Sequence, residues 1–296
     1  MNYKNCNLCE RKCNINRYEK KGICGATNKL KVARAALHHW EEPCISGSSG
    51  SGTIFFSNCN LKCLFCQNKK ISIKGFGKEI TINRLSEICM ELQKQGANNI
   101  NLVTPTHYVP SIIKGIKKAK EKGLNIPVVY NTSSYESIDT IKKLNKIVDV
   151  YLPDLKYKDD TIAKNYSNIK DYFKVATRNI EEMYNQVGKP IFNQNGIMIK
   201  GIIVRVLLLP GHLNDAKEII KYLYDKYNNN IYISIMNQYT PVEKIDKYIN
   251  LNRKVTNEEY DDLIEYACDL GIENAFIQEG ETQEESFIPD FNKTGV

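Results

Sequence analysis

Short apolar segments alternate with amphipathic segments along most of this chain, and the alternation constrains the fold more than any other feature. Apolar runs predict strands at residues 53–57, 99–104, 127–131, 147–154, 201–209, 231–236 and 274–278. Helical periodicity lies between them, at residues 82–95, 109–122, 137–145, 161–166, 180–187, 215–227 and 258–270. Near-continuous apolar strands separated by helices are typical of a parallel sheet. Six or seven such units favour an α/β fold that closes into a full or partial barrel over a doubly wound sheet.

The composition fits one large globular domain with a small appendage. The chain has 296 residues, of which 42% are hydrophobic, and this content excludes disorder. No apolar run reaches the roughly 18 residues of a membrane-spanning helix, and the N-terminus lacks the apolar core of a secretory signal. We therefore expect a cytoplasmic protein without membrane contact. The net charge of +7 is spread over amphipathic segments, so nucleic acid is not the expected partner.

Ten cysteines carry more information than the charge does. In a reducing compartment, clustered cysteines are typical of metal ligands or catalysts. Seven of the ten form two groups, Cys6, Cys9, Cys13 and Cys24, and then Cys59, Cys63 and Cys66. Cys44, Cys89 and Cys268 stand alone, and we expect them to be ordinary packing residues.

The second group follows the first predicted strand with the spacing C-x3-C-x2-C. Three thiolates on one loop can hold three irons of a [4Fe–4S] cube and leave the fourth iron open. A ferredoxin or a structural zinc site needs a fourth ligand, and no further cysteine follows within the next twenty residues. The spacing therefore indicates a cluster whose open iron binds another molecule. The alternative is a structural zinc or redox-inert cluster loop.

This loop resembles the radical S-adenosylmethionine (SAM) superfamily, whose signature also places an aromatic residue, here Phe65, before the last cysteine. The resemblance implies a partial (β/α)6 TIM-type barrel in which the amine and carboxylate of SAM chelate the open iron. A reductant such as flavodoxin or ferredoxin would supply one electron, which cleaves SAM to methionine and a 5′-deoxyadenosyl radical. That radical would abstract hydrogen from a substrate.

The resemblance extends through residues 50–240, most closely to pyruvate formate-lyase activating enzymes and their PflX-type relatives. Many superfamily members carry Gly-Gly-Glu after the second strand, where this chain has Val103-Thr-Pro-Thr. Thr104 and Thr106 are therefore expected to take over binding of SAM. The activase pattern further implies SAM contacts from Asn131, Thr132, Ser133, Asp154, Lys156 and Gln238. Asn131 stands where the activases have an aspartate that helps to hold a monovalent cation, so the sequence does not decide whether this chain binds that cation.

Arg205 interrupts an apolar strand, and an unpaired buried charge is costly. Its partner is either the carboxylate of SAM or a carboxylate of the protein. His38, His39, His107 and His212 form no helical metal pair, and we interpret them as structural, with His107 the candidate for a role in the site.

The first cysteine group, Cys6, Cys9, Cys13 and Cys24, offers four thiolates within nineteen residues, which suit either a tetrahedral zinc or a second Fe–S cluster. The sequence does not decide between zinc and a cluster. It also leaves open whether the bound metal stabilises the lobe or relays electrons. The Cys-x-Leu-Cys-x-Arg-x-Cys pattern resembles the leader of PflX-type proteins. We predict a Cys-rich metal-binding lobe and linker at residues 1–50, the barrel at 51–280 and a polar tail at 281–296.

These features predict a radical SAM enzyme of the activating-enzyme type, with activation of a glycyl-radical enzyme as its specific form. Modification of another peptide, a small-molecule rearrangement and RNA modification are the alternatives within the same chemistry. A different class of function, a non-catalytic iron–sulfur carrier or sensor, would share the cluster but would not bind SAM.

Overall fold

The parallel sheet predicted from the alternation forms the body of the molecule. This computed structural model describes residues 3–278 and 289–296. Within them, ten strands form one sheet: β1 (Leu30–His38), β2 (Ser51–Phe56), β3 (Lys78–Ile80), β4 (Ile100–Val103), β5 (Val128–Thr132), β6 (Val150–Pro153), β7 (Ile191–Phe192), β8 (Met198–Leu207), β9 (Tyr232–Met236) and β10 (Ala275–Ile277). The order is β10-β9-β8-β6-β5-β4-β2-β1-β3, with β7 paired to β8. From β2 to β10 the neighbours on this path are parallel, so the predicted α/β partial barrel is confirmed.

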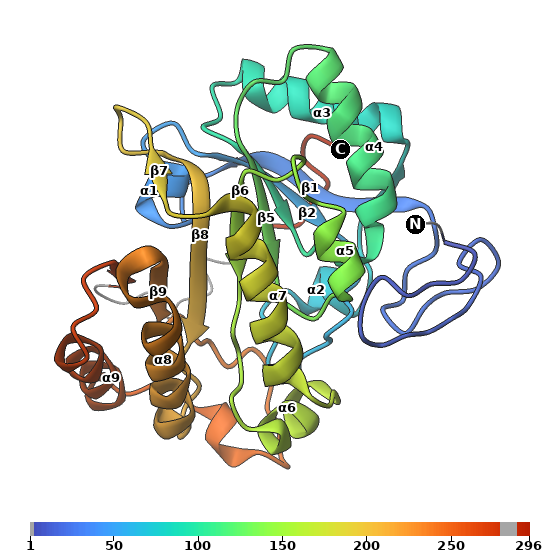
Figure 1. The fold of residues 1–296 in the computed structure, drawn as a ribbon. Coiled ribbons are helices and arrows are strands. Elements are labelled where there is room, and N and C mark those ends of the chain that lie inside the picture. The colour runs from blue at the N-terminus through green and yellow to red at the C-terminus, as the bar shows by residue number, and fades with distance from the viewer. Residues whose placement is uncertain (1–2, 279–288) are drawn as a thin grey trace.

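The helices mostly cover the outer face of the curved sheet, and the first of them packs on its inner face (Figure 1). They are α1 (Pro43–Ser46), α2 (Lys69–Ser72), α3 (Ile82–Lys94), α4 (Val109–Glu121), α5 (Ile138–Lys142), α6 (Asp160–Ser167), α7 (Tyr172–Val187), α8 (Leu213–Tyr227) and α9 (Asn257–Asp269). Local capping explains several starts, because Thr81 accepts from the Arg84 amide and Thr256 forms a capping box with Glu259. None of the described helices is both long and apolar enough to cross a membrane.

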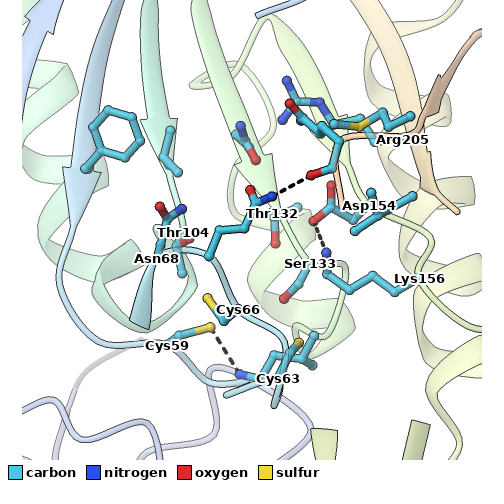
Figure 2. A pocket seen from close by; sticks show the side chains of 18 of the residues that line it. Cys59, Cys63, Cys66, Asn68, Thr104, Thr132, Ser133, Asp154, Lys156 and Arg205 are labelled. Atoms are coloured by element: carbon cyan, nitrogen blue, oxygen red, sulfur yellow. Dashed lines mark hydrogen bonds and ion pairs between the residues drawn. The ribbon is translucent and has the colours of Figure 1, made fainter. Parts of the chain in front are cut away.

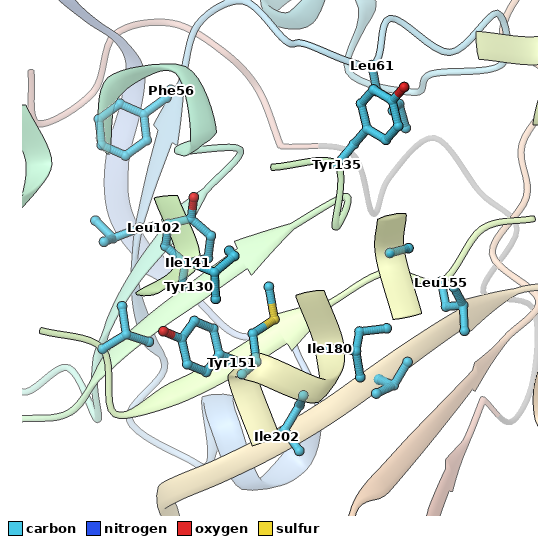
Figure 3. Close-up of a cluster of buried hydrophobic side chains, with 14 of the residues drawn as sticks. Phe56, Leu61, Leu102, Tyr130, Tyr135, Ile141, Tyr151, Leu155, Ile180 and Ile202 are labelled. Carbon is cyan, nitrogen blue, oxygen red and sulfur yellow. The ribbon is translucent and has the colours of Figure 1, made fainter. Parts of the chain in front are cut away.

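Side chains alternate between the two faces of the sheet, and the two faces have different surroundings. Phe56, Leu102, Tyr130, Tyr151 and Ile202 point outward into the main core, where they meet the helices (Figure 3). Their neighbours in the sequence point to the inner face, which the long helices do not cover. The polar inner residues therefore belong to strands that are otherwise apolar, and they lie where a ligand can reach them.

The inner face is filled at one end by a segment that the sequence analysis assigned to the lobe and linker. Ile45 of α1 is fully buried in a cluster with Val129, Val150 and Ile203. Asn99 Nδ2 donates to the carbonyl oxygen of Ile45 at 2.7 Å, which fixes α1 beneath the sheet. Residues 30–50 thus contribute β1 and α1 to the sheet and its packing, whereas the sequence indicated only turns there. The alanines of β1 favour a helix locally, and antiparallel pairing with β2 overrides that preference.

The C-terminal residues also join the sheet. Phe291 is buried against Phe55, with the ring centroids 5.4 Å apart. The Ala35 amide donates to the Thr294 carbonyl at 2.9 Å, and the Lys293 amide donates to the Ala33 carbonyl at 3.0 Å. Residues 281–288 of the expected polar tail lie outside the described residues, and residues 289–296 cover the open edge of β1.

A glycine substitution tests this contact of the C-terminus. Gly295 has a φ of +72°, and a Cβ built on it would overlap the carbonyl oxygen of Ala35. Gly295→Ala is expected to displace the segment, so that the Ala35 amide loses its protection in hydrogen exchange. Gly196→Ala is the matched control, because Gly196 has a φ of +73° with nothing within 4 Å. The control should cost about 1–2 kcal/mol of stability through strain alone and leave Ala35 protected. Unchanged protection of Ala35 in Gly295→Ala would contradict the assignment.

Candidate functional site

A pocket opens on the inner face of the sheet, at the carboxyl ends of the parallel strands (Figure 2). This is the end at which barrels of this kind place their chemistry. The loop after β2 contributes its three cysteines and Phe65, and successive strand ends contribute polar side chains. Twelve of the expected site residues line the pocket: Cys59, Cys63, Phe65, Cys66, Thr104, Asn131, Thr132, Ser133, Asp154, Lys156, Arg205 and Gln238.

The cysteine loop is shaped by its backbone and anchored by its aromatic residue. Asn58 and Lys62 adopt φ values of +73° and +56°, which turn the chain sharply on either side of Cys59. Phe65 packs within an aromatic cage, with ring centroids 6.4 Å from Tyr157, 6.2 Å from Tyr166 and 5.9 Å from Tyr239. The aromatic residue before the last cysteine therefore fixes the loop over the barrel mouth.

Each sulfur of this loop receives a polar contact from the protein. The Leu61 amide donates to Cys59 Sγ at 3.3 Å, and the Ser167 hydroxyl donates to Cys63 Sγ at 3.1 Å. Cys66 Sγ lies 3.2 Å from Ser72 Oγ. Burial, reinforced by the neighbouring thiol of Cys63, raises the pKa of Cys59 to about 12, and burial also raises the pKa of Cys66. Three thiolates can therefore share this loop only when a cation offsets their charge.

The donor set fits an iron–sulfur cluster better than the other centres considered. The three thiols come from one loop, line one pocket and have no disulfide partner. Within residues 3–278 and 289–296, no three Cys, His, Asp or Glu side chains already stand at the spacing of a metal-binding group. Binding of a metal or cluster would therefore require the three sulfur atoms to move closer together. Soft sulfur ligands with hydrogen-bond donors around them are the surroundings in which Fe–S clusters occur.

Two residues beside the loop have features that suit a bound ligand. Ser133 Oγ is buried and has no hydrogen-bond partner among the described residues. Thr104 adopts a φ of +56°, which is a strained conformation for a β-branched residue, and its amide donates to the Asn131 carbonyl at 3.0 Å. A ligand with hydrogen-bonding groups fits this part of the pocket, because an orphaned buried hydroxyl costs free energy.

Asp154 and Lys156 come from the end of β6 and pair with each other. Lys156 Nζ lies 2.7 Å from Asp154 Oδ2 (Figure 2). Burial alone would lower the pKa of Lys156, but the charge of Asp154 and the nearby Cys63 outweigh burial and raise it. Lys156 is therefore a cation near neutral pH, and the two charges stand side by side at the pocket wall.

Arg205 has carboxylate partners within the protein. Its Nε donates to Glu42 Oε1 and its Nη2 to Glu42 Oε2, both at 2.8 Å, and Nη2 also contacts Glu41. Of the two alternatives for this buried charge, the ion pair within the protein is the one that the structure contains. The sequence analysis did not identify Glu41 or Glu42, and its only signal was that Arg205 requires a carboxylate somewhere.

Thr106 and His107 are not among the described residues that line the pocket. The Thr106 hydroxyl donates to Glu136 Oε1 at 2.6 Å, and Thr132 donates to the same oxygen. Glu136 is fully buried, and burial raises its pKa. The expectation that Thr106 faces SAM is therefore not met, because a buried carboxyl group that the sequence analysis missed engages its hydroxyl. His107 Nε2 lies 2.8 Å from the Ser57 carbonyl, and burial lowers the pKa of His107 to about 3, so it is neutral and structural.

The four N-terminal cysteines lie together in the small lobe beside the barrel. Cys6, Cys9 and Cys24 are buried, and Cys13 is half-buried. Burial raises the pKa of Cys9, and the thiols of Cys24, Cys13 and Cys6 raise it further. A Cβ built on Gly22 would lie 3.2 Å from Cys24 Sγ and 3.8 Å from Cys13 Sγ, so these two sulfurs line one small space that a glycine keeps open.

Comparisons with known proteins identify the family of this chain. Residues 53–223 match the family model described as the radical SAM superfamily. An uncharacterized protein of Methanocaldococcus jannaschii is 32% identical over 275 residues, which cover 90% of this chain and 75% of that protein.

Solved structures with the same fold have diverged far in sequence. SuiB of Streptococcus suis, solved with S-adenosylmethionine bound, aligns with a TM-score of 0.51 at 17% identity over 75% of this chain. This chain spans only 48% of SuiB, so the likeness concerns the fold alone. A domain of pyruvate-formate lyase-activating enzyme from Bacteroides vulgatus aligns with a TM-score of 0.42 at 16% identity, over 58% of this chain and 92% of that domain.

Because Arg205 forms buried ion pairs, replacing it should reverse the way in which the free energy of unfolding changes with pH. Burial by itself would raise the pKa of Glu42, but the charge and hydrogen bonds of Arg205 lower it. In the wild type, the ionised Glu42 stabilises the fold at pH values above the pKa that this group has in the unfolded chain. The stabilisation is lost as the pH falls through the lower pKa that Glu42 has in the folded protein. Arg205→Met leaves two carboxylates buried, so unfolding free energy should fall by about 3–5 kcal/mol at pH 7.

In Arg205→Met the pKa of Glu42 is expected to rise above its unfolded value, so the variant should become more stable as the pH is lowered from 7 to 5. Chemical denaturation at several pH values measures this trend. Arg84→Met is the control, because Arg84 pairs with Glu91 on the solvent side of α3 and should cost less than about 1 kcal/mol. A variant of Arg205 that follows the wild-type pH trend would refute this account of the charge cluster.

Proposed function

The chain belongs to the radical SAM superfamily, and on that premise we propose that Cys59, Cys63 and Cys66 hold a [4Fe–4S] cluster that cleaves SAM. The observation that carries the proposal is that three free thiols with the superfamily spacing line one pocket at the carboxyl ends of the strands. When bound, the cluster and SAM supply a 5′-deoxyadenosyl radical, which removes hydrogen from a substrate.

The residues of the loop bind the cluster and set its surroundings. The thiolates of Cys59, Cys63 and Cys66 would ligate three irons, and the Leu61 amide and the hydroxyls of Ser72 and Ser167 stand beside the sulfurs. Such donors raise the reduction potential of a cluster, because they offset the negative charge gained on reduction. The aromatic cage around Phe65 excludes water from one side of the loop.

The strand ends would orient SAM. Ser133 Oγ lacks a partner and Asn131 lies on the pocket wall, so both can accept or donate hydrogen bonds to the bound molecule. Asp154 and Lys156 offer one charge of each sign to a zwitterion. Thr132 and Arg205 are already engaged by Glu136 and by Glu41 and Glu42, so their proposed part is to shape the pocket wall. Gln238 completes this set at the end of β9.

For the substrate, we propose a peptide or a loop of a protein. The sheet ends at β10 and β3 without closing, and an open-sided barrel admits a segment of polypeptide. SuiB, which shares this fold, has also been solved with its precursor peptide SuiA. Activation of a glycyl-radical enzyme, by removal of hydrogen from a glycine Cα, is the specific form we propose, with flavodoxin or ferredoxin as electron donor. All ten cysteines are free thiols, which suits the cytoplasm as the setting.

We further propose that Cys6, Cys9, Cys13 and Cys24 hold a second metal centre. The Ile23 amide lies 3.4 Å from Cys13 Sγ, as donors to metal-bound thiolates do. Among the described residues of the lobe, Tyr3, Cys6 and Leu8 form a small apolar cluster apart from the main core. A metal would therefore supply folding free energy that this cluster does not.

Replacing one cluster ligand tests the proposed chemistry. Anaerobically reconstituted wild-type protein, given dithionite and SAM, is expected to form 5′-deoxyadenosine. Cys63→Ala should abolish that product, because two cysteines cannot hold a cluster with one open iron. Cys268→Ala is the matched control, since Cys268 is an exposed thiol on α9. Deoxyadenosine from Cys63→Ala at the wild-type rate would exclude the assignment.

The second metal centre is tested in a variant that lacks the first. With Cys59, Cys63 and Cys66 all changed to alanine, the purified protein should still contain about one zinc or about four irons. Adding Cys9→Ala should remove that metal and lower the thermal stability of the lobe. A triple variant free of both metals would eliminate the second centre.

A further inference from the structure

Arg11 reaches from the N-terminal lobe into the cysteine loop of the barrel. It lies between Cys9 and Cys13 in the sequence. Its Nε donates to the Asn60 carbonyl at 2.9 Å, and its Nη2 donates to the Leu61 carbonyl at 3.1 Å. Asn60 and Leu61 directly follow Cys59, so one guanidinium from the lobe holds the backbone of the loop at its first cysteine.

The same guanidinium holds the segment that contacts Cys63. Arg11 Nη2 donates to the Ser167 carbonyl at 2.9 Å, and Nη1 donates to the Asn168 carbonyl. Ser167 in turn donates its hydroxyl to Cys63 Sγ at 3.1 Å and lies 2.7 Å from the Tyr157 hydroxyl. Arg11 therefore joins the loop to the end of α6 through four backbone carbonyls. A planar guanidinium with five donors can do this, and a lysine ammonium cannot reproduce it.

A second arginine of the lobe is linked to the start of the loop through His107. Arg17 is fully buried, and its Nη1 lies 3.8 Å from Cys6 Sγ and 2.6 Å from the His107 carbonyl. His107 Nε2 donates to the Ser57 carbonyl at 2.8 Å, because a carbonyl can only accept. Ser57 lies two residues before Cys59. Arg11 thus contacts the loop directly after Cys59, and Arg17, which lies beside Cys6, reaches the segment before Cys59 through His107.

The lobe is itself fastened to the barrel where it meets β5. The Ser137 amide donates to the Leu8 carbonyl at 3.1 Å, and Cys9 forms a β-bridge with Glu136. Asn60 Nδ2 reaches the Tyr135 carbonyl at 3.3 Å, so the cysteine loop is tied to the same short segment. Cys9 therefore fixes the chain two residues before Arg11, and Cys13 follows two residues after it within the lobe.

We propose that Arg11 is a positioning residue for the cluster loop, and that a metal bound by the four N-terminal cysteines keeps Arg11 in place. This inference rests on the proposed function, since it assigns a purpose to the lobe within the same site. Loss of the guanidinium leaves four carbonyls without their donor and frees the loop near Cys59. Metal in the lobe would then control how firmly the barrel holds its cluster and SAM.

The test compares Arg11→Gln with Arg178→Gln in the reconstituted full-length protein. Arg178 pairs with Glu10 of the same lobe at 2.9 Å, but none of its hydrogen bonds reaches the loop. Arg11→Gln is expected to weaken retention of the loop iron against a chelator by about 10–100-fold. It should also shift the midpoint potential of the loop cluster to more negative values, because a cation beside it is lost. Arg178→Gln should match the wild type in both readouts.

Arg11→Lys separates charge from geometry. It keeps the cation, so the potential should return toward the wild-type value, while iron retention should stay impaired. Cys13→Ser removes one lobe ligand and leaves Arg11 present, and it should reproduce the loss of iron retention. The double variant Arg11→Gln/Cys13→Ser should be no worse than either single variant, because both break the same link.

The outcomes distinguish this inference from the function on which it rests. Wild-type potential, iron retention and SAM-dependent change of the EPR spectrum in Arg11→Gln would overturn the positioning role while leaving SAM cleavage intact. Additive effects in the double variant would overturn the link to the N-terminal metal. Absence of deoxyadenosine from the wild type would count against the proposed function instead. Should Arg11→Gln fail to fold, Arg11→Lys and Cys13→Ser still decide between these results.

Discussion

The contact between Arg205 and the carboxylates of Glu41 and Glu42 determines how the interior of this barrel is divided. Arg205 points to the inner face from β8, and the two glutamates come from the segment between β1 and α1. On one side of these charges, α1 fills the inner face with apolar side chains. On the other side the pocket stays open. Because a buried ion pair is costly to break, this contact keeps α1 in place and leaves room for a ligand at the strand ends.

Charge also governs the opposite end of the pocket, where three thiols share one loop. Burial raises the pKa of Cys59 and of Cys66, so a cation beside these two thiols would favour their ionised form. Arg11 supplies fixed hydrogen bonds to the backbone of this loop from a lobe that carries four cysteines of its own. The two cysteine groups are separate in the sequence, and the guanidinium of Arg11 is a direct link between their segments in the structure.

Much of the fold followed from local patterns, and the exceptions have a common cause. The parallel strands and most helices were predictable because each has a clear period and a recognisable end. β1 was missed because its alanines favour a helix, and α1 because four residues are too few to show a helical period. α7 begins at Tyr172, well before the predicted start at residue 180, since its first turns are stabilised by packing of Tyr172 and Val175 on the core.

The sequence by itself determined the family, the barrel and the grouping of three cysteines on one loop, because spacing along one loop and periodicity along one strand are local properties. Only the tertiary structure decided which partners the polar residues have. It gave Arg205 to Glu41 and Glu42, turned Thr106 toward Glu136, and brought Arg11 to the cluster loop. Contacts between residues so far apart in the chain depend on how the strands and helices pack, and no pattern within a short stretch of sequence encodes that packing.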